Sequence, residues 1–471
     1  MDKMMLMTRS AYFLRKIVNT DSRRTFSSTC NNKNSWRRAP ASMVENEEFR
    51  VFMVCGEVSG DIIGGRLISS LKRLSPCPLR FAGVGGSMMN NEGLRSLFPM
   101  EDLAVMGIWE LLPHLNNFRK RLLETTEAAF LFQPHVVVTV DSKGFSFRFL
   151  KLLRARYNQQ GLSCPLRFHY VAPSFWAWKG GEERMNGLAK LVDHVLCILP
   201  FEVDICRAHG LAATFVGHPV VEDALSAQLG TSSQVDELVV LGKADNFRNE
   251  HGISSETTII SLLPGSRLQE VTRMLPIFAD TLKLLRCSFP DMVAVIPVAS
   301  NQHVQEHIKK NVQQWVVPAI LISGESSFKK YDAFSASKAA IATSGTAVME
   351  LQLARLPCVV GYRAHFLTEW FIRLRTKSKY VSLPNILLDS AVIPEALLSN
   401  CTADRLSMLL NKIIWDESLR EEQMASARNV LNILCPKQKS LYNLHGGRLG
   451  SSCTPSMIAA STIMYELTCN T

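Results

Sequence analysis

The sequence predicts an α/β protein with two Rossmann-like, doubly wound domains, each built on a parallel β-sheet with helices on both faces. Short runs of β-branched and other apolar residues alternate with longer helical stretches, which is typical of βαβ units. This rhythm stops over the polar residues 226–257 and then restarts. The chain has 471 residues, of which 47% are hydrophobic, so it is long enough to bury two hydrophobic cores.

We assign residues 45–225 to the first domain. Its strands are expected at Val51–Cys55, Leu79–Val84, Val136–Val140, Arg167–Val171 and Val195–Leu199. Its helices are expected at Gly64–Leu74, Leu115–Phe132 and Phe145–Tyr157. In this architecture ligands bind in a cleft at the carboxyl ends of the strands.

We interpret residues 226–257 as a linker or insertion and residues 258–436 as the second domain. Its strands are expected at Thr258–Leu263, Met292–Pro297, Ala319–Ile322, Ala339–Ala342 and Cys358–Tyr362. Residues 437–471 form a C-terminal tail, which is irregular up to Thr454 and then carries an expected return helix at Pro455–Leu467.

The first 44 residues have the composition of an organelle transit peptide. They contain nine Lys or Arg and two Asp, and are rich in Ser and Thr. An apolar core of about 7–15 residues, which a secretory signal needs, is absent from this leader. Arg24 lies three positions before a mitochondrial-type processing point. We therefore predict import into the mitochondrion, with the plastid as the alternative destination. A disordered basic tail without a targeting role is the other interpretation of this segment.

The bulk composition argues against several other classes. The net charge is +10, but the leader accounts for +7 of it, so the nearly neutral body is not expected to bind nucleic acid. No apolar run reaches the roughly 18–20 residues of a membrane-spanning helix. The twelve cysteines are scattered without a C-x-x-C pair, which favours reduced thiols in a non-secreted compartment.

Acidic residues follow two expected strands of the first domain. The first strand runs into a loop of small residues that contains Glu57, Ser59 and Asp61. This loop is not the dinucleotide pattern, and its acids would repel a pyrophosphate; capping of the next helix is the alternative for both acids. Asp141 ends the strand Val136–Val140 and is our candidate general base, with an N-cap as the alternative.

Two histidines, His169 and His218, lie at strand or turn edges and are candidates for the substrate or acceptor side, with a structural role as the more common alternative. His and Cys residues do not occur in metal-ligand spacing, so we predict no metal site and no cofactor.

The second domain carries two loops suited to a phosphate. Gly265, Ser266 and Arg267 follow its first strand, and the Arg fork suits phosphate oxygens. Ser344, Gly345 and Thr346 follow another strand and open a helix, whose free N–H groups attract anions. Glu350, one turn later, could accept hydrogen bonds from ribose hydroxyls. Simple N-capping is the alternative for Ser344 and Thr346, but two such loops in one domain favour a nucleotide diphosphate.

Long blocks of the sequence resemble the bacterial lipid-A-disaccharide synthases, in unbroken order over about residues 50–430. The matching blocks are Gly56–Asp61, Gly83–Met88, Phe98–Gly107, His169–Trp178, Leu199–Glu202, Phe215–Pro219, Leu262–Arg267, Ser344–Ala347 and Tyr380–Asn385.

The resemblance implies a GT-B fold with two domains facing a cleft, UDP-2,3-diacylglucosamine as donor and 2,3-diacylglucosamine 1-phosphate as acceptor. It implies a metal-free transfer at a membrane surface; a homodimer is a further option. Carried over residue by residue, the resemblance assigns UDP binding to Arg267, Ser344, Gly345, Thr346, Glu350 and Asn385. It makes Asp141 the base and places Glu57, Ser59 and Asp61 on the acceptor side.

One departure from the family concerns the loop after Asp141. The family commonly continues Asp-Ala-Pro-Asp-Phe-Asn, whereas this chain has Ser142-Lys143-Gly144-Phe145-Ser146. The first acid is kept and the second is lost. Two rival functions therefore stand beside the transferase: a non-catalytic lipid or nucleotide binder descended from the enzyme, and a UDP-sugar epimerase of the same fold.

A densely apolar segment, Val105–Leu115, is the candidate membrane contact. Its Trp109 suits an interface, and Arg119, Lys120 and Arg121 follow it, as in surface helices near anionic lipid. Core packing of an amphipathic helix is the alternative. We expect peripheral membrane binding through residues 105–121.

Overall fold

A computed structural model describes most of the chain. The described residues are 48–103, 115–228, 238–298, 301–323, 327–343, 345–364, 369–370, 374–436 and 454–470. The predicted transit peptide, most of the candidate membrane segment and Ser344 lie outside them. The chain divides into two compact units. Unit 1 comprises residues up to Phe175, Gly180–Pro219 and Pro436 onwards, and unit 2 comprises Trp176–Lys179 and Val220–Cys435.

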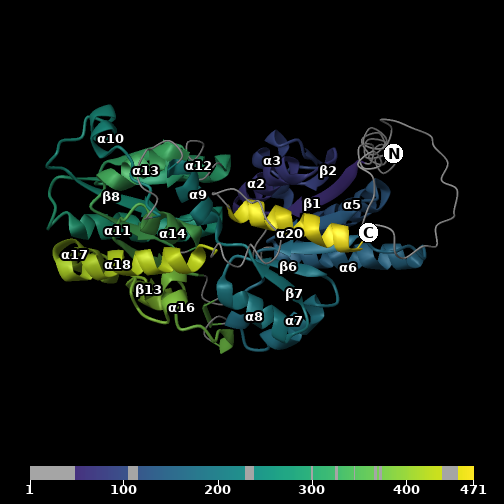
Figure 1. The fold of residues 1–471 in the computed structure, drawn as a ribbon. Helices are drawn as coiled ribbons and strands as arrows, with labels where there is room; N and C mark the ends of the chain where they lie inside the picture. The colour runs from purple at the N-terminus through teal and green to yellow at the C-terminus, as the bar shows by residue number, and fades with distance from the viewer. Residues whose placement is uncertain are drawn as a thin grey trace. The chain divides into compact units, whose positions relative to one another are not determined.

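Unit 1 is built on a seven-stranded parallel sheet in the order β3-β2-β1-β4-β5-β6-β7 (Figure 1). Its strands are β1 (Phe49–Cys55), β2 (Leu79–Val84), β3 (Arg95–Ser96), β4 (Val136–Val140), β5 (Leu166–Tyr170), β6 (His194–Cys197) and β7 (Ala212–Phe215). Its helices are α2 (Val58–Leu74), α3 (Ser87–Asn91), η3 (Met100–Leu103), α5 (Leu115–Phe132), α6 (Lys143–Gln159), α7 (Gly181–Leu188), α8 (Pro200–Ala208) and α20 (Pro455–Asn470); η5 (Phe175–Ala177) follows β5.

The alternation of side chains along each strand creates two cores, one on each face of this sheet. Phe52 and Val54 of β1 pack with α5 and α6 on one face. Val51 and Met53 of the same strand pack with α2 and α20 on the other face. A strand buried on both faces has to be apolar throughout, which explains the continuous apolar runs in the sequence.

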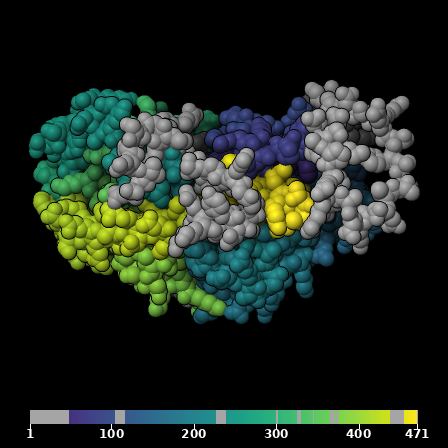
Figure 2. All heavy atoms as spheres, viewed as in Figure 1, coloured from purple at the N-terminus to yellow at the C-terminus, as the bar shows by residue number. Residues whose placement is uncertain are grey.

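The C-terminal helix α20 is part of unit 1, although nearly four hundred residues separate it from α2 (Figure 1). Its Ile458, Ala459 and Ile463 are buried in the core that also contains α2. The hydroxyls of Ser456 and Ser70 are 2.8 Å apart across this contact. Figure 2 shows that the outer side of α20 lies on the surface of unit 1.

Unit 2 has a six-stranded parallel sheet in the order β10-β9-β8-β11-β12-β13. Its strands are β8 (Thr258–Leu263), β9 (Met292–Val298), β10 (Ala319–Ser323), β11 (Ala339–Ala342), β12 (Cys358–Tyr362) and β13 (Glu395–Leu397). Its helices are α9 (Pro219–Gln228, whose first residue belongs to unit 1), α10 (Ala244–Glu250), α11 (Leu268–Leu285), α12 (Gln302–Val312), α13 (Ser327–Ala336), α14 (Thr346–Leu353), α16 (Leu383–Leu388), η6 (Leu398–Asn400), α17 (Ala403–Trp415) and α18 (Glu417–Leu434).

The two faces of this second sheet are also covered. Ile260 and Leu262 of β8 pack with α11, α12 and α17, and Ile259 packs with α10 and α13. Strands β3, β7 and β13 were not expected from the sequence. Strands β3 and β13 have two and three residues, which is too short for a periodic signal, and β7 (Ala-Ala-Thr-Phe) has no continuous apolar run.

Candidate functional site

Each sheet reverses its strand order at one point, and the predicted site loops lie at these points. In unit 1 the reversal falls between β1 and β4, and in unit 2 between β8 and β11. Parallel α/β sheets bind ligands outside the carboxyl ends of the two strands at such a switch point. The loops after β1, β4, β8 and β11 are those that carry Glu57, Asp141, Arg267 and Gly345.

The two loops at the switch point of unit 1 touch each other. Cys55 at the end of β1 is in register with Val140 at the end of β4. A Cβ atom on Gly56 would lie 2.5 Å from the Oγ atom of Ser142, a distance that real Cβ atoms do not tolerate. The glycine therefore lets the loop that carries Glu57 approach the loop that carries Asp141.

Asp141 has a strained backbone. Asp141 and Ser142 both have positive φ angles, 49° and 45°, a left-handed conformation that costs a residue with a side chain about 1–3 kcal/mol. The conformation is held because the Asp141 N–H donates to the Tyr170 carbonyl (2.9 Å) and the Ser146 hydroxyl donates to the Asp141 carbonyl (2.9 Å). Such outliers cluster at functional sites.

The alternative role of Asp141 as a helix cap does not match the structure. The N-cap residue of α6 is Ser142, and its side chain makes no cap hydrogen bond. Glu57 holds the N-cap position of α2, also without a side-chain cap hydrogen bond. Glu57, Ser59 and Asp141 are half-buried at the carboxyl edge of the sheet.

Cys55 lies beneath these acids. Burial raises the pKa of its thiol, and the charges of Asp61, Asp141 and Glu57 raise it further. The thiol is therefore neutral at physiological pH.

Asp61, predicted on the acceptor side, is an internal structural residue. Its carboxylate is buried and accepts hydrogen bonds from the N–H groups of Gly86 (2.8 Å), Met88 (2.9 Å) and Met89 (3.1 Å). The carboxylate thus caps the start of α3 rather than of its own helix. A residue 25 positions away supplies this cap, so the sequence alone did not indicate it.

His169 and His218 are buried, and their environments favour the neutral imidazole. Burial lowers the pKa of His169 to about 3 and that of His218 to about 4. His169 lies in β5 with its Nδ1 atom 2.8 Å from the Thr139 hydroxyl. Neither ring is placed to exchange a proton with solvent at neutral pH, so both predicted acceptor-side histidines belong to the interior of unit 1.

The loop after β8 in unit 2 depends on a glycine with φ of 111°, a region that favours glycine. Gly265 is followed by the exposed Ser266 and then by Arg267, which is the N-cap residue of α11. The Arg267 guanidinium donates to Glu270 (3.0 Å). This contact holds the cation at the start of α11, where backbone N–H groups also point outwards.

The helix start after β11 has no side-chain cap. Gly345 is the N-cap residue of α14 and has φ of 76° and ψ of −152°, which is accessible almost only to glycine. Thr346 is the first helical residue and is exposed. Simple capping by Thr346 is therefore not what the structure shows.

Glu350, the predicted ribose ligand, lies one turn into α14 and forms an ion pair with Lys330 of α13 (3.0 Å). Lys330 was not found by sequence reasoning, because nothing in its local pattern distinguishes it from a solvent-exposed lysine. The pair brings a second cation close to the start of α14.

Asn385, predicted to hold UDP, is fully buried, and its amide is used inside unit 2. The amide nitrogen donates to the Ile393 carbonyl (2.8 Å) and to Glu395 (2.9 Å), and the amide oxygen accepts from the Ile393 N–H (2.8 Å). Glu395 also accepts from the N–H and hydroxyl of Ser382. This network orders the loop before α16, and it gives Asn385 a structural role.

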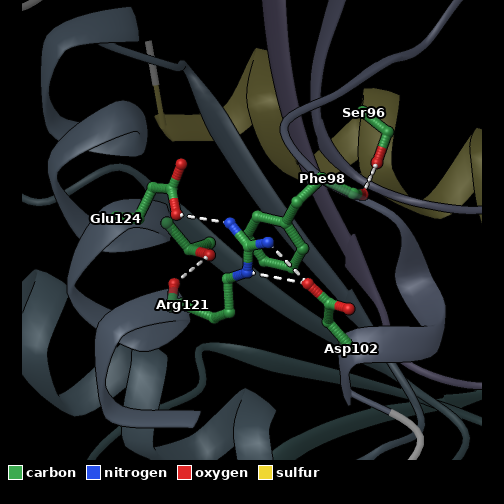
Figure 3. Close-up of polar contacts among 6 residues, drawn as sticks. Ser96, Phe98, Asp102, Arg121 and Glu124 are labelled. Atoms are coloured by element: carbon green, nitrogen blue, oxygen red, sulfur yellow. Dashed lines mark hydrogen bonds and ion pairs between the residues drawn. The ribbon is translucent and has the colours of Figure 1, made fainter. Parts of the chain in front are cut away.

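Arg121 of α5 makes several internal contacts (Figure 3). Its guanidinium pairs with Asp102 of η3 (2.6 Å) and with Glu124 (2.9 Å), and it stacks 4.4 Å from the centre of the Phe98 ring. Two carboxylates and one aromatic ring thus hold this cation within unit 1. Arg119 and Lys120 are exposed.

Three further features concern the described part of the chain. The ten cysteines within it are free thiols. Within the same residues no group of three or more His, Cys, Asp or Glu side chains could hold a metal ion. None of the described helices is both long and apolar enough to cross a bilayer.

Known structures resemble this chain in fold. The crystal structure of UDP-GlcNAc 2-epimerase from Neisseria meningitidis, bound to UDP-GlcNAc, aligns with a TM-score of 0.55 and 12% identity, over 90% of this chain and 100% of that one. The likeness confirms the predicted two-domain, Rossmann-like architecture of the GT-B type.

Sequence relatives define the family. Residues 51–444 match the family described as lipid-A-disaccharide synthetase. The probable mitochondrial lipid-A-disaccharide synthase of Arabidopsis thaliana is 58% identical over 420 residues, which cover 88% of this chain and 91% of the relative. The lipid-A-disaccharide synthase of Rhodospirillum centenum is 43% identical over 380 residues, 81% of this chain and 88% of the relative. The chain therefore belongs to the lipid-A-disaccharide synthase family.

Proposed function

We propose that this protein is an inverting glycosyltransferase of lipid A biosynthesis, which joins UDP-2,3-diacylglucosamine to 2,3-diacylglucosamine 1-phosphate and releases UDP. The observation that carries the proposal is the position of three family blocks, Gly56–Asp61, Leu262–Arg267 and Ser344–Ala347, which follow strands at the two switch points. A strained carboxylate, Asp141, belongs to the first switch point, and two glycine-dependent loops, one of which carries Arg267, belong to the second.

In the proposed reaction the 6-hydroxyl of the acceptor attacks the anomeric carbon of the donor, the bond to UDP breaks, and Asp141 takes the hydroxyl proton. Glu57 and Ser59 would contact the acceptor. Departing diphosphate gains negative charge, which Arg267 and the start of α14 would stabilise. We assign Gly265, Ser266, Ser344, Gly345 and Thr346 to diphosphate binding and Glu350 to the ribose.

The rival functions are less well supported. The resemblance to an epimerase rests on 12% identity and concerns the fold. A non-catalytic binder has no need of a carboxylate in a strained conformation, since strain is retained where function requires it.

The test is to incubate the full-length protein with both lipids and to follow the products by mass spectrometry. Disaccharide 1-phosphate and UDP in equal amounts are expected. Asp141→Asn protein, checked for folding, is the matched control. Absence of the disaccharide, or conversion of the UDP-sugar into its epimer, would contradict the proposal.

We also propose peripheral membrane binding through residues 105–121, because both substrates carry acyl chains. The paired Arg121 leaves Arg119 and Lys120 as the exposed cations of this stretch. Flotation of Ile108→Ser/Trp109→Ser protein with anionic liposomes should fall below wild type; equal flotation would indicate that the segment packs in the core.

We also propose a homodimer, which light scattering on the purified protein without liposomes would check.

The mitochondrial name of the Arabidopsis relative agrees with the location predicted from the leader. Import of a fusion of residues 1–44 to a fluorescent protein would test whether this leader is sufficient.

A further inference from the structure

Two cations flank one aromatic ring beside Asp141, and the reaction described above does not use them. Lys143 Nζ and the guanidinium carbon of Arg184 each lie 5.9 Å from the centre of the Phe175 ring. Phe175 is buried, whereas Lys143 and Arg184 are exposed. The ring is therefore a fixed support that both cationic side chains contact.

Lys143 occupies a position that does not need a lysine for the fold. It is the first residue of α6, directly after the N-cap residue Ser142. Proline is well suited to this position, and the family pattern has proline there. The next residue, Gly144, stands where the family has its second acid. This chain has thus gained a positive charge and lost a negative one, two and three residues after Asp141.

The change in charge matters for an anionic substrate. Lys143 lies within electrostatic reach of Asp141, Glu57 and Arg184. The two carboxylates alone would repel a phosphate monoester, which carries about −1.5 to −2 charges at neutral pH. Lys143 and Arg184 offset them, and the N-terminus of α6 adds a partial positive charge on the same side.

We infer that Lys143 and Arg184 bind the 1-phosphate of the acceptor lipid and set the preference of this chain for a phosphorylated acceptor. The inference rests on the proposed function and identifies the residues that recognise the phosphate of the acceptor. Arg184 supplies a planar fork that suits two phosphate oxygens, and Lys143 supplies a mobile point charge. Phe175 keeps both cations beside Asp141, so that phosphate binding would orient the attacking hydroxyl.

The experiment compares two acceptors on the full-length protein: 2,3-diacylglucosamine 1-phosphate and the same lipid with a free 1-hydroxyl. The preference is the ratio of the two kcat/KM values. Lys143→Gln and Arg184→Gln should each lower this ratio about 10- to 100-fold, since charge-assisted contacts have this magnitude. Lys143→Gln removes the charge and keeps a good helix former at the start of α6. Lys151→Ala removes an exposed charge two turns further along α6 and should leave the ratio unchanged.

Several outcomes would overturn the inference. An unchanged ratio in both variants would do so, as would an equal fall of the ratio in Lys151→Ala. If UDP inhibited the variants less strongly than wild type while the ratio of the two kcat/KM values stayed unchanged, Lys143 and Arg184 would bind the donor instead of the acceptor. A second readout does not depend on turnover: wild-type protein should bind the soluble probe glucosamine 1-phosphate more tightly than Lys143→Gln/Arg184→Gln protein. Equal affinities would refute the inference even if no disaccharide forms, which separates it from failure of the proposed function.

Discussion

The two switch points of this protein occupy the same place in two similar sheets, but they carry different kinds of residue. At β1/β4 the loops carry Glu57 and Asp141, and the left-handed backbone is adopted by residues with side chains. At β8/β11 the left-handed positions are Gly265 and Gly345, and the nearby charges include Arg267 and Lys330.

This difference indicates how one architecture is divided between two tasks. Glycine brings backbone N–H groups close to a ligand without a side chain in the way, which suits a diphosphate. A strained aspartate holds one carboxylate in one direction, which suits proton transfer. The same topology thus supplies positions, and the residue types decide the chemistry.

The largest expected effect is at Asp141. Asp141→Asn should lower kcat by about 10²–10⁴ through loss of the base, with UDP affinity within a few-fold of wild type. Asparagine tolerates the left-handed conformation, so the backbone should persist. Initial rates and calorimetric UDP titrations check both statements. Near-full activity of the Asp141→Asn protein would show that Asp141 is not the base, and the proposed contrast between the two switch points would be lost.

Arg267→Ala should weaken UDP binding and lower the rate together, each about 10- to 100-fold, because a charge-assisted contact to the diphosphate is lost. Glu270→Ala is a useful second variant, because it removes the Glu270 carboxylate that pairs with Arg267. Titration of UDP into each variant measures the effect. Wild-type affinity in Arg267→Ala would remove the cation from the unit 2 site.

Acidification should destabilise unit 1 before unit 2. Among the described residues the buried histidines, His169, His194 and His218, all belong to unit 1. Burial lowers the pKa of each, to about 3 for His169 and about 4 for His218. A histidine with a lowered pKa stays neutral in the folded protein, whereas the same side chain in the unfolded chain takes up a proton below its pKa near 6.5. Its contribution to the free energy of unfolding is therefore complete above about pH 6.5. As the pH falls from about 6.5 towards the folded-state pKa, each histidine loses about 1.4 kcal/mol of that contribution per pH unit.

Hydrogen exchange at pH 7.5 and pH 5, corrected for intrinsic rates, compares β4 and β5 with β8 and β9. His169→Gln cannot be protonated and should reduce the difference between the units. Equal loss of protection in both sheets would show that the histidines do not govern the acid response.

The smallest expected effects separate the two kinds of strained turn. Gly345→Ala should cost about 1–3 kcal/mol, because its φ and ψ are accessible almost only to glycine, although a Cβ would meet no atom within 4 Å. Ser142→Gly should change stability by less than about 1 kcal/mol, since relief of strain is offset by the greater freedom of the unfolded chain. Urea unfolding measures both; a reversed order would contradict the assignment of strain.

The tertiary structure also reassigned residues that the sequence had grouped together. Glu57, Ser59 and Asp61 were all expected on the acceptor side, yet the Asp61 carboxylate accepts hydrogen bonds from three backbone N–H groups. Asn385 was assigned to UDP by resemblance, yet it is saturated by Ile393 and Glu395. A motif can be shared by a family because it supports a loop as well as because it touches a ligand.

The sequence by itself determined the fold class, all described strands except β3, β7 and β13, the family and the loops that carry the candidate site. These depend on local periodicity and on contiguous motifs, which are visible along the chain. Only the tertiary structure decided which polar groups are spent on the fold, because partners such as Asp61 with Gly86 or Glu350 with Lys330 are distant in sequence. It also placed Lys143 and Arg184 on one ring, a juxtaposition that no local pattern encodes.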